Sequence, residues 1–170
     1  MSKRTRQYLG ILSALVAYYL IHEGAHLVAA LAMGVFKEVK FLGLGMQVDV
    51  HAANMTDAQM GVFCVAGAIS TLLAAVILTL LTPRICRIGS KMVKAAFYYI
   101  SIAMLFLDPV YLSVLCGFFG GGDMNGIRLL CPETAARIAF GVLFLLALLV
   151  FIRRILPQYQ AAFRENGAEA

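Results

Sequence analysis

The chain has 170 residues, of which 62% are hydrophobic and 14% are charged, and its net charge is +5. A soluble domain is about half apolar and a quarter charged, so this composition excludes an ordinary soluble enzyme, a disordered chain and a collagen-like fibre. The length allows one domain, and the composition predicts a small bundle of membrane helices. The basic residues flank the apolar runs without forming an aromatic-interleaved stripe, so we expect no nucleic-acid partner.

Apolar runs long enough to cross a bilayer are the main feature of the sequence. They cover about residues 8–34, 59–81, 93–112 and 133–152. The polar segment 35–57 mixes partial alternation with glycines, which predicts a short β-hairpin. Asp108-Pro109 interrupts the third run, so we expect its helix to end near Leu107 and a re-entrant loop to precede the fourth span.

These elements predict an all-α membrane protein with a single domain over residues 1–156 and a polar tail over 157–170. Lys and Arg concentrate in the N-terminal segment, in the loop between the second and third spans, and after the fourth span. The positive-inside rule therefore predicts a multi-pass protein of the cell membrane with both termini in the cytoplasm. The cysteines form no CxxC pair, and we expect them to behave as small buried hydrophobes.

Three ionisable residues, His22, Glu23 and His26, lie inside the first apolar run. Each costs on the order of 2.5–3.5 kcal/mol at such a depth, so a functional role is expected. In a helix the two histidines share one face and can bind one metal ion, while Glu23 lies close enough to hold a metal-bound water. This is the HExxH pattern of two zinc ligands and a general base. The simpler alternative is a pair of structural histidines that form hydrogen bonds between helices.

Catalytic zinc usually has three protein ligands and a water, so a third ligand must come from another segment. The candidates are Asp108, Asp123, His51, Asp49 and Glu133. We favour Asp123, because the glycines of GGGDMNG allow the backbone to approach closely and a re-entrant loop can reach the depth of the histidines. Asp108 remains the rival ligand, and its alternative role is a cap at the end of the third span.

With HExxH in a membrane helix and an aspartate in a later segment, the sequence resembles the site-2 protease family of intramembrane zinc metalloproteases. Asp123 in GDMNGI is similar to the family's LDG aspartate, and residues 65–70 resemble its AGP-type helix. The resemblance implies zinc bound by His22, His26 and Asp123, with Glu23 as the base. It also implies hydrolysis of peptide bonds in or near the transmembrane segments of protein substrates, which the 35–57 segment would align.

Two other functions are compatible with the same residues. One is a catalytically inactive metal-binding or regulatory membrane protein, a pseudoprotease. The other is a small proton-coupled transporter that uses the intramembrane His and Glu as a relay, although the chain shows none of the internal repeats that are common in transporters. For oxyanion stabilisation the sequence offers only the neighbourhood of Asp108 or Asn125, and Asn125 is equally suited to a turn.

Overall fold

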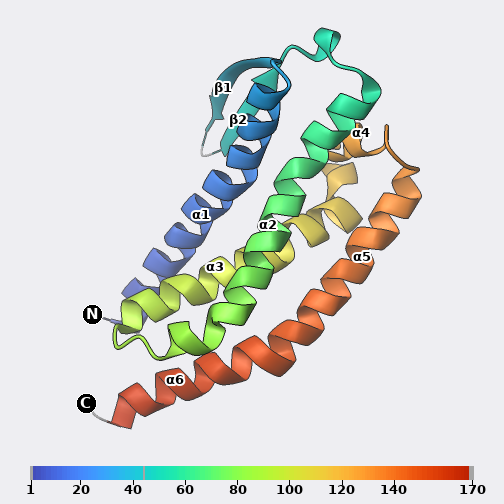
Figure 1. Cartoon of the computed structure of the whole chain (residues 1–170). Coiled ribbons are helices and arrows are strands. Elements are labelled where there is room, and N and C mark those ends of the chain that lie inside the picture. Colours follow the sequence, from blue (N-terminus) through green and yellow to red (C-terminus); the bar gives the residue numbers. More distant parts are fainter. Residues whose placement is uncertain (1, 44, 169–170) are drawn as a thin grey trace.

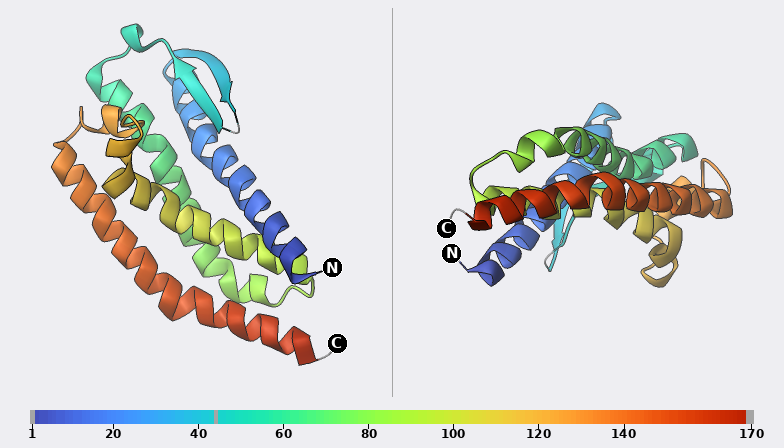
Figure 2. Two further views of the ribbon diagram at one scale, coloured as in Figure 1. Left: turned by 180° about the vertical axis from the view of Figure 1, so that it is seen from behind. Right: turned by 90° about the horizontal axis from the view of Figure 1, so that it is seen from below.

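The computed structural model describes residues 2–43 and 45–168. Its framework is a bundle of long helices, and the two chain ends lie at the same end of that bundle (Figures 1 and 2). The four long helices are α1 (Lys3–Ala32), α2 (Asp57–Cys86), α3 (Lys91–Val110) and α5 (Glu133–Val150). Each belongs to a helical segment that is long and apolar enough to cross a membrane. The predicted set of four helices of spanning length is therefore confirmed.

Side-chain caps set the starting points of three of these helices. The Ser2 hydroxyl accepts a hydrogen bond from the Thr5 N–H at the start of α1. Thr56 and Gln59 form a reciprocal capping box at the start of α2, and Ser90 caps α3 after a tight turn. Each cap satisfies backbone N–H groups that lack partners in the first helical turn. The turn before α3 brings α2 and α3 side by side.

The predicted hairpin is also confirmed. Strand β1 (Phe36–Leu42) pairs antiparallel with β2 (Gly45–Val50), and in the described part of the chain these two strands make up the sheet. The hairpin lies beside the C-terminal part of α1, and a short turn, η1 (Ala52–Asn54), leads on to α2 (Figure 1). Val48 is buried in a core cluster that reaches across to α2, so the hairpin is part of the core.

The expectation that the third helix ends at Leu107 was wrong. The helix continues through Pro109 to Val110, followed by a π-helical turn, η2 (Tyr111–Leu115), and by η3 (Cys116–Phe118). The Ser113 hydroxyl donates to the Pro109 carbonyl at 2.5 Å. A wide turn together with a hydroxyl donor is a common way for a membrane helix to accommodate proline. Asp108 consequently lies within a helix and not at its end.

The segment between the third and fourth spans folds back onto the bundle. It contains the short helix α4 (Met124–Ile127), which packs against α2, and Gly126 there leaves no room for a side chain beside Cys64. This return brings Asp123, the residue before α4, to the depth of the other candidate residues. Beyond α5 the chain stays helical through η4 (Phe151–Ile155) and α6 (Leu156–Ala168), so most of the expected polar tail is a packed helix.

Candidate metal centre

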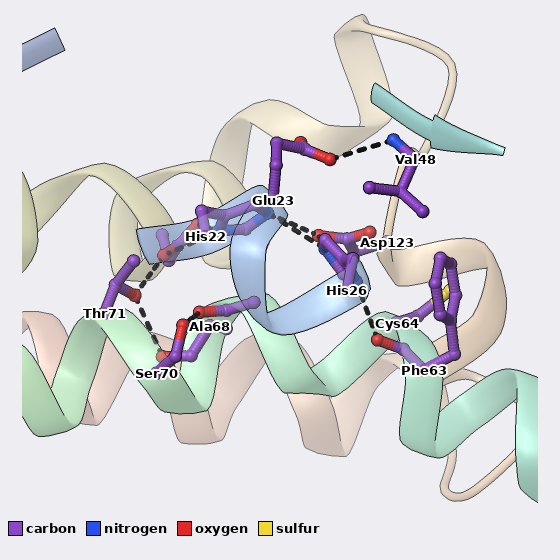
Figure 3. A network of polar contacts seen from close by, with 12 residues as sticks. His22, Glu23, His26, Val48, Phe63, Cys64, Ala68, Ser70, Thr71 and Asp123 are labelled. Carbon is purple, nitrogen blue, oxygen red and sulfur yellow. Dashed lines mark hydrogen bonds and ion pairs between the residues drawn. The ribbon is translucent and has the colours of Figure 1, made fainter. Parts of the chain in front are cut away.

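The imidazoles of His22 and His26 lie one turn apart on the face of α1 that packs against α2. Both residues are buried, with exposed fractions of 7% and 3%, and their Nε2 atoms are 3.2 Å apart. Together with Glu23 they offer ligand atoms that all lie within 4.8 Å of one another. This buried group can hold a metal ion (Figure 3).

A backbone carbonyl of α2 orients His26. Its Nδ1 lies 2.8 Å from the Phe63 carbonyl oxygen, and because a carbonyl can only accept, Nδ1 carries the proton and donates. The same contact is visible in Figure 3. In the neutral ring Nε2 of His26 is then the acceptor, and a neutral imidazole is the form that binds metals.

A buried carboxylate orients His22 in the same way. Asp108 is 1% exposed, and its Oδ2 lies 3.3 Å from Nδ1 of His22. The Asp108 carboxylate also accepts hydrogen bonds from the Tyr18 hydroxyl, at 2.6 Å, and from the Thr71 hydroxyl. These contacts place Asp108 on the Nδ1 side of His22, behind the ring. Asp108 can accept a proton that lies on Nδ1 of His22, and in a neutral ring of this form Nε2 is the acceptor.

Asp123 approaches from the opposite side of the two rings. Its Oδ2 lies 3.1 Å from Nε2 of His22 and 3.5 Å from Nε2 of His26. Three glycines precede it, with φ angles of 75°, 88° and 46°, which are values that favour glycine. Their conformation lets the loop turn sharply into the bundle. Asp123 and the two Nε2 atoms thus form a triangle of acceptors on the Nε2 side of the rings.

This donor set fits a cation. When both rings are neutral and carry their protons on Nδ1, no proton lies between the two Nε2 atoms and the Asp123 carboxylate. Three lone-pair atoms at 3.1–3.5 Å from one another repel unless a positive charge lies between them. A metal ion at this place would complete the contacts of all three atoms, whereas a proton on Nε2 of His22, which faces Asp123 at 3.1 Å, would give a structural network instead.

Gly67 on α2 provides the space beside this triangle. A Cβ atom at this position would lie 2.6 Å from Nε2 of both His22 and His26. Ser70, one turn further along α2, donates to the Ile21 carbonyl of α1 at 3.0 Å and holds the two helices together there. The close approach of α2 to the imidazoles thus requires glycine at position 67.

Glu23 points away from the triangle towards the hairpin. It is half-buried, and its Oε2 accepts a hydrogen bond from the Val48 N–H of β2 at 3.1 Å (Figure 3). A cavity of about 770 Å³ lies beside it. The walls of that cavity are Glu23, both histidines, Asp123, strand β2 and Tyr111. The carboxylate of Glu23 therefore faces space in which a substrate can lie next to the histidines.

The three remaining ligand candidates lie away from the triangle, and two of them form ion pairs. His51 is exposed at the start of η1, and Glu133 pairs with Arg137 at 2.8 Å. Asp49 pairs with Lys40 at 2.6 Å and with a second lysine of β1, and hydrogen bonds from these lysines lower its pKa to about 2. These residues stabilise the hairpin and α5 and do not contact the imidazoles.

One neighbour of the centre has a role that the sequence analysis allowed, and two others were not expected from the sequence. Asn125 donates to the Gly120 carbonyl at 2.9 Å, so its observed role is to close the glycine-rich turn. Tyr18 and Thr71 orient Asp108 and were missed, although Tyr18 lies four residues before His22 and hence on the same helix face. Comparison of the chain with protein-family models, with curated proteins and with solved structures finds no match. What the centre does is therefore inferred from its geometry.

Proposed function

We propose that the chain is a zinc-dependent endopeptidase of the membrane that hydrolyses peptide bonds in or near the transmembrane segments of other proteins. One observation carries this proposal. A triangle of two imidazole nitrogens and one carboxylate oxygen, with a second carboxylate at its side and a cavity beside it, lies within a bundle that has four helices of spanning length. The positive-inside pattern supports a cell-membrane protein with both termini in the cytoplasm.

The size and chemistry of the triangle favour zinc. Zinc bonds of about 2.0–2.1 Å in a tetrahedral site place ligand atoms roughly 3.3 Å apart. The edges of the triangle are 3.1, 3.2 and 3.5 Å. Magnesium and calcium prefer all-oxygen sites, whereas two imidazoles and one carboxylate suit zinc. Zinc held by His22, His26 and Asp123 would lower the pKa of a bound water and polarise the scissile carbonyl.

Glu23 is the residue that moves protons in this proposal. It lies next to His22 in the chain but outside the triangle, with its carboxylate directed to the cavity. From there it takes a proton from the attacking water and passes it to the leaving amine. The Val48 N–H keeps the carboxylate oriented towards the cavity, so the hairpin contributes to the position of the base.

The edge of β2 that faces away from β1 suggests how a substrate is held, once Glu23 and Asp49 release the N–H groups of Val48 and Val50. The Val48 N–H points to Glu23 and not to its partner Val39 on β1, so the backbone groups of Met46 and Val50 point the same way. A substrate helix must unwind locally, because a helix keeps its carbonyl groups in hydrogen bonds. Strand addition along β2 would hold the unwound segment extended, with its carbonyl groups close to Glu23.

The experiment is cleavage of a membrane-helix substrate in detergent, with zinc measured on the same protein samples. Glu23→Gln should lower the rate by at least about 10²–10⁴-fold, since positioned acid–base catalysis contributes that much, and should keep zinc. His22→Ala should lose both zinc and cleavage. His51→Ala, which removes an exposed histidine outside the centre, should lose neither.

Four results would contradict parts of the proposal. Cleavage by the Glu23→Gln protein at the normal rate would show that Glu23 is not the general base. Purified protein without zinc would show that the centre is not a zinc site. A zinc-loaded protein that cleaves nothing across a broad panel of membrane segments would instead be a metal-binding or regulatory protein. Ion flux that does not need zinc would indicate the transporter.

A further inference from the structure

The proposed hydrolysis requires a hydrogen-bond donor for the oxyanion, and the two residues that the sequence offered have other partners. When water adds to a carbonyl carbon, negative charge develops on the carbonyl oxygen, and a donor aimed at that oxygen stabilises the transition state. Asp108 lies behind the His22 ring and does not line the cavity, and Asn125 donates to the Gly120 carbonyl at 2.9 Å. This leaves the other lining residues as the source of a side-chain donor.

Tyr111 places a phenol in the wall of this cavity. It is the first residue of the π-helical turn η2, and such turns are frequent at functional sites. The residue is half-buried and packs against the core cluster that contains Cys64 and Met124. Its hydroxyl forms no hydrogen bond with another residue in the part of the chain that the structure describes. Because a phenol O–H is a donor, this hydroxyl can donate to a molecule in the cavity.

The glycine-rich loop places this hydroxyl beside Asp123. A Cβ atom at Gly122 would overlap the Tyr111 hydroxyl, so the hydroxyl lies directly against the backbone of residue 122. Asp123 is the next residue, and its carboxylate is close enough to act on the hydroxyl electrostatically. Because Oδ2 of Asp123 belongs to the triangle, the Tyr111 hydroxyl lies on the side of the cavity that is next to the proposed metal.

Two other uncharged donors of the cavity wall, Tyr19 and Gln47, belong to the wall that carries the base. Tyr19 precedes Glu23 by one turn of α1 and shares its helix face. Gln47 is on β2, next to Val48, whose N–H holds the Glu23 carboxylate (Figure 3). A carboxylate repels an oxyanion beside it, so the carbonyl oxygen of a substrate is best directed to another wall. Tyr111 lies on such a wall, which η2 and the glycine-rich loop form.

We propose that Tyr111 is a further catalytic residue, whose hydroxyl donates a hydrogen bond to the oxyanion of the substrate. The inference rests on the endopeptidase function proposed above and adds a residue to its site. As the water oxygen bonds to the carbonyl carbon, one electron pair of the C=O bond moves to the carbonyl oxygen, and Glu23 takes a proton from the water. The C–N bond then breaks, the C=O bond re-forms, and the proton passes from Glu23 to the amine. Tyr111 keeps its own proton throughout and acts through the hydrogen bond alone.

The test compares Tyr111→Phe with the unchanged protein in zinc content, in cleavage and in the binding of a phosphinic peptide. Phenylalanine keeps the ring and its packing, so zinc content should stay normal. Loss of one oxyanion donor should lower kcat by about 10²–10³-fold with little change in KM. A phosphinic peptide carries a tetrahedral, negatively charged group in place of the oxyanion. Its binding should weaken by about 10–100-fold, which is the contribution of a hydrogen bond to a charged group. Tyr8→Phe, at a 72% exposed position outside the cavity, is the control and should change none of these.

Four outcomes would overturn the inference. If Tyr111→Phe cleaves and binds the phosphinic peptide normally, the protease stands but Tyr111 is not its oxyanion donor. If Tyr19→Phe shows the loss and Tyr111→Phe does not, the donor is Tyr19. Loss of zinc from Tyr111→Phe would make this residue a ligand or a structural support of the centre. If the unchanged protein carries zinc but cleaves no membrane segment, the proposed function itself fails, and the role of Tyr111 fails with it.

Discussion

Substituting Asp108 by Asn tests whether this residue orients a ligand or is one. Its carboxylate receives hydrogen bonds from the Tyr18 hydroxyl, the Thr71 hydroxyl and the Nδ1–H of His22. A carboxylate can accept all three because both of its oxygens are acceptors. An asparagine of the same shape has one acceptor oxygen and one NH₂ group, so at least one of the three donors must face another donor.

The effect on zinc follows from which donor loses its partner. If the new NH₂ group faces His22, the ring must accept at Nδ1 and carry its proton on Nε2, which can then no longer bind the metal. If the NH₂ group faces the hydroxyl of Tyr18 or Thr71, the His22 ring keeps its tautomer, but the side chain that orients the ring has lost one of its hydrogen bonds. Loss of such an outer partner typically weakens metal binding by about 10–100-fold, or about 1.4–2.7 kcal/mol. Asp123→Ala removes a ligand itself and should weaken zinc binding further.

The measurement is competition for zinc between each variant and a chromophoric chelator in detergent. Asp57→Asn makes the same chemical change at an exposed position at the start of α2 and serves as the control. Normal zinc affinity in Asp108→Asn would refute the positioning role. If Asp108→Ala lost the metal while Asp123→Ala kept it, the third ligand would be Asp108, and the triangle described here would not be the metal site.

Three further predictions concern the space at Gly67, the hydrogen bond from Tyr18 to Asp108, and the membrane topology. Gly67→Ala should remove zinc and activity because its methyl group would lie 2.6 Å from both imidazoles, whereas Gly24→Ala, with nothing within 4 Å, should change neither. Tyr18→Phe should weaken zinc binding by less than Asp108→Asn in the same chelator assay, because one of three donors is lost and the ring stays in place. Cysteines introduced near Ser90 should be labelled from the cytoplasm and those near Thr56 from outside; the reverse pattern would contradict the positive-inside assignment.

Local patterns in the sequence were sufficient to predict the two histidines of the site. His22 and His26 are four residues apart in an apolar run, and helix geometry alone brings them onto one face. The hairpin and the long helices also follow from local signals. Local signals do not show which of Asp108 and Asp123 is the better ligand candidate, because this depends on which side of the His22 ring each carboxylate reaches. That contact joins residues 86 or 101 positions apart, and no local pattern encodes it.

Pro109 is a second case in which a local sequence rule did not predict the structure. The local rule that proline ends a helix holds when water must solvate the freed carbonyl groups. Here Pro109 is buried in the bundle, and the helix passes through it into the wider turn η2. The consequence for the site is direct, because a helix that ended at Leu107 would not hold Asp108 behind His22 in a fixed direction.

The buried polar residues of the centre stabilise one another, which explains how they can lie inside an apolar bundle. Asp108 would be costly to bury alone, but three donors surround it, and the same three bonds fix the ring of His22. Tyr18 adds a second contact, because its ring stacks on His22 with centroids 5.1 Å apart. On the other side of the rings the two Nε2 atoms and the Asp123 carboxylate lie 3.1–3.5 Å from one another, and the charge of this carboxylate can be balanced by a proton on an imidazole or by a bound cation.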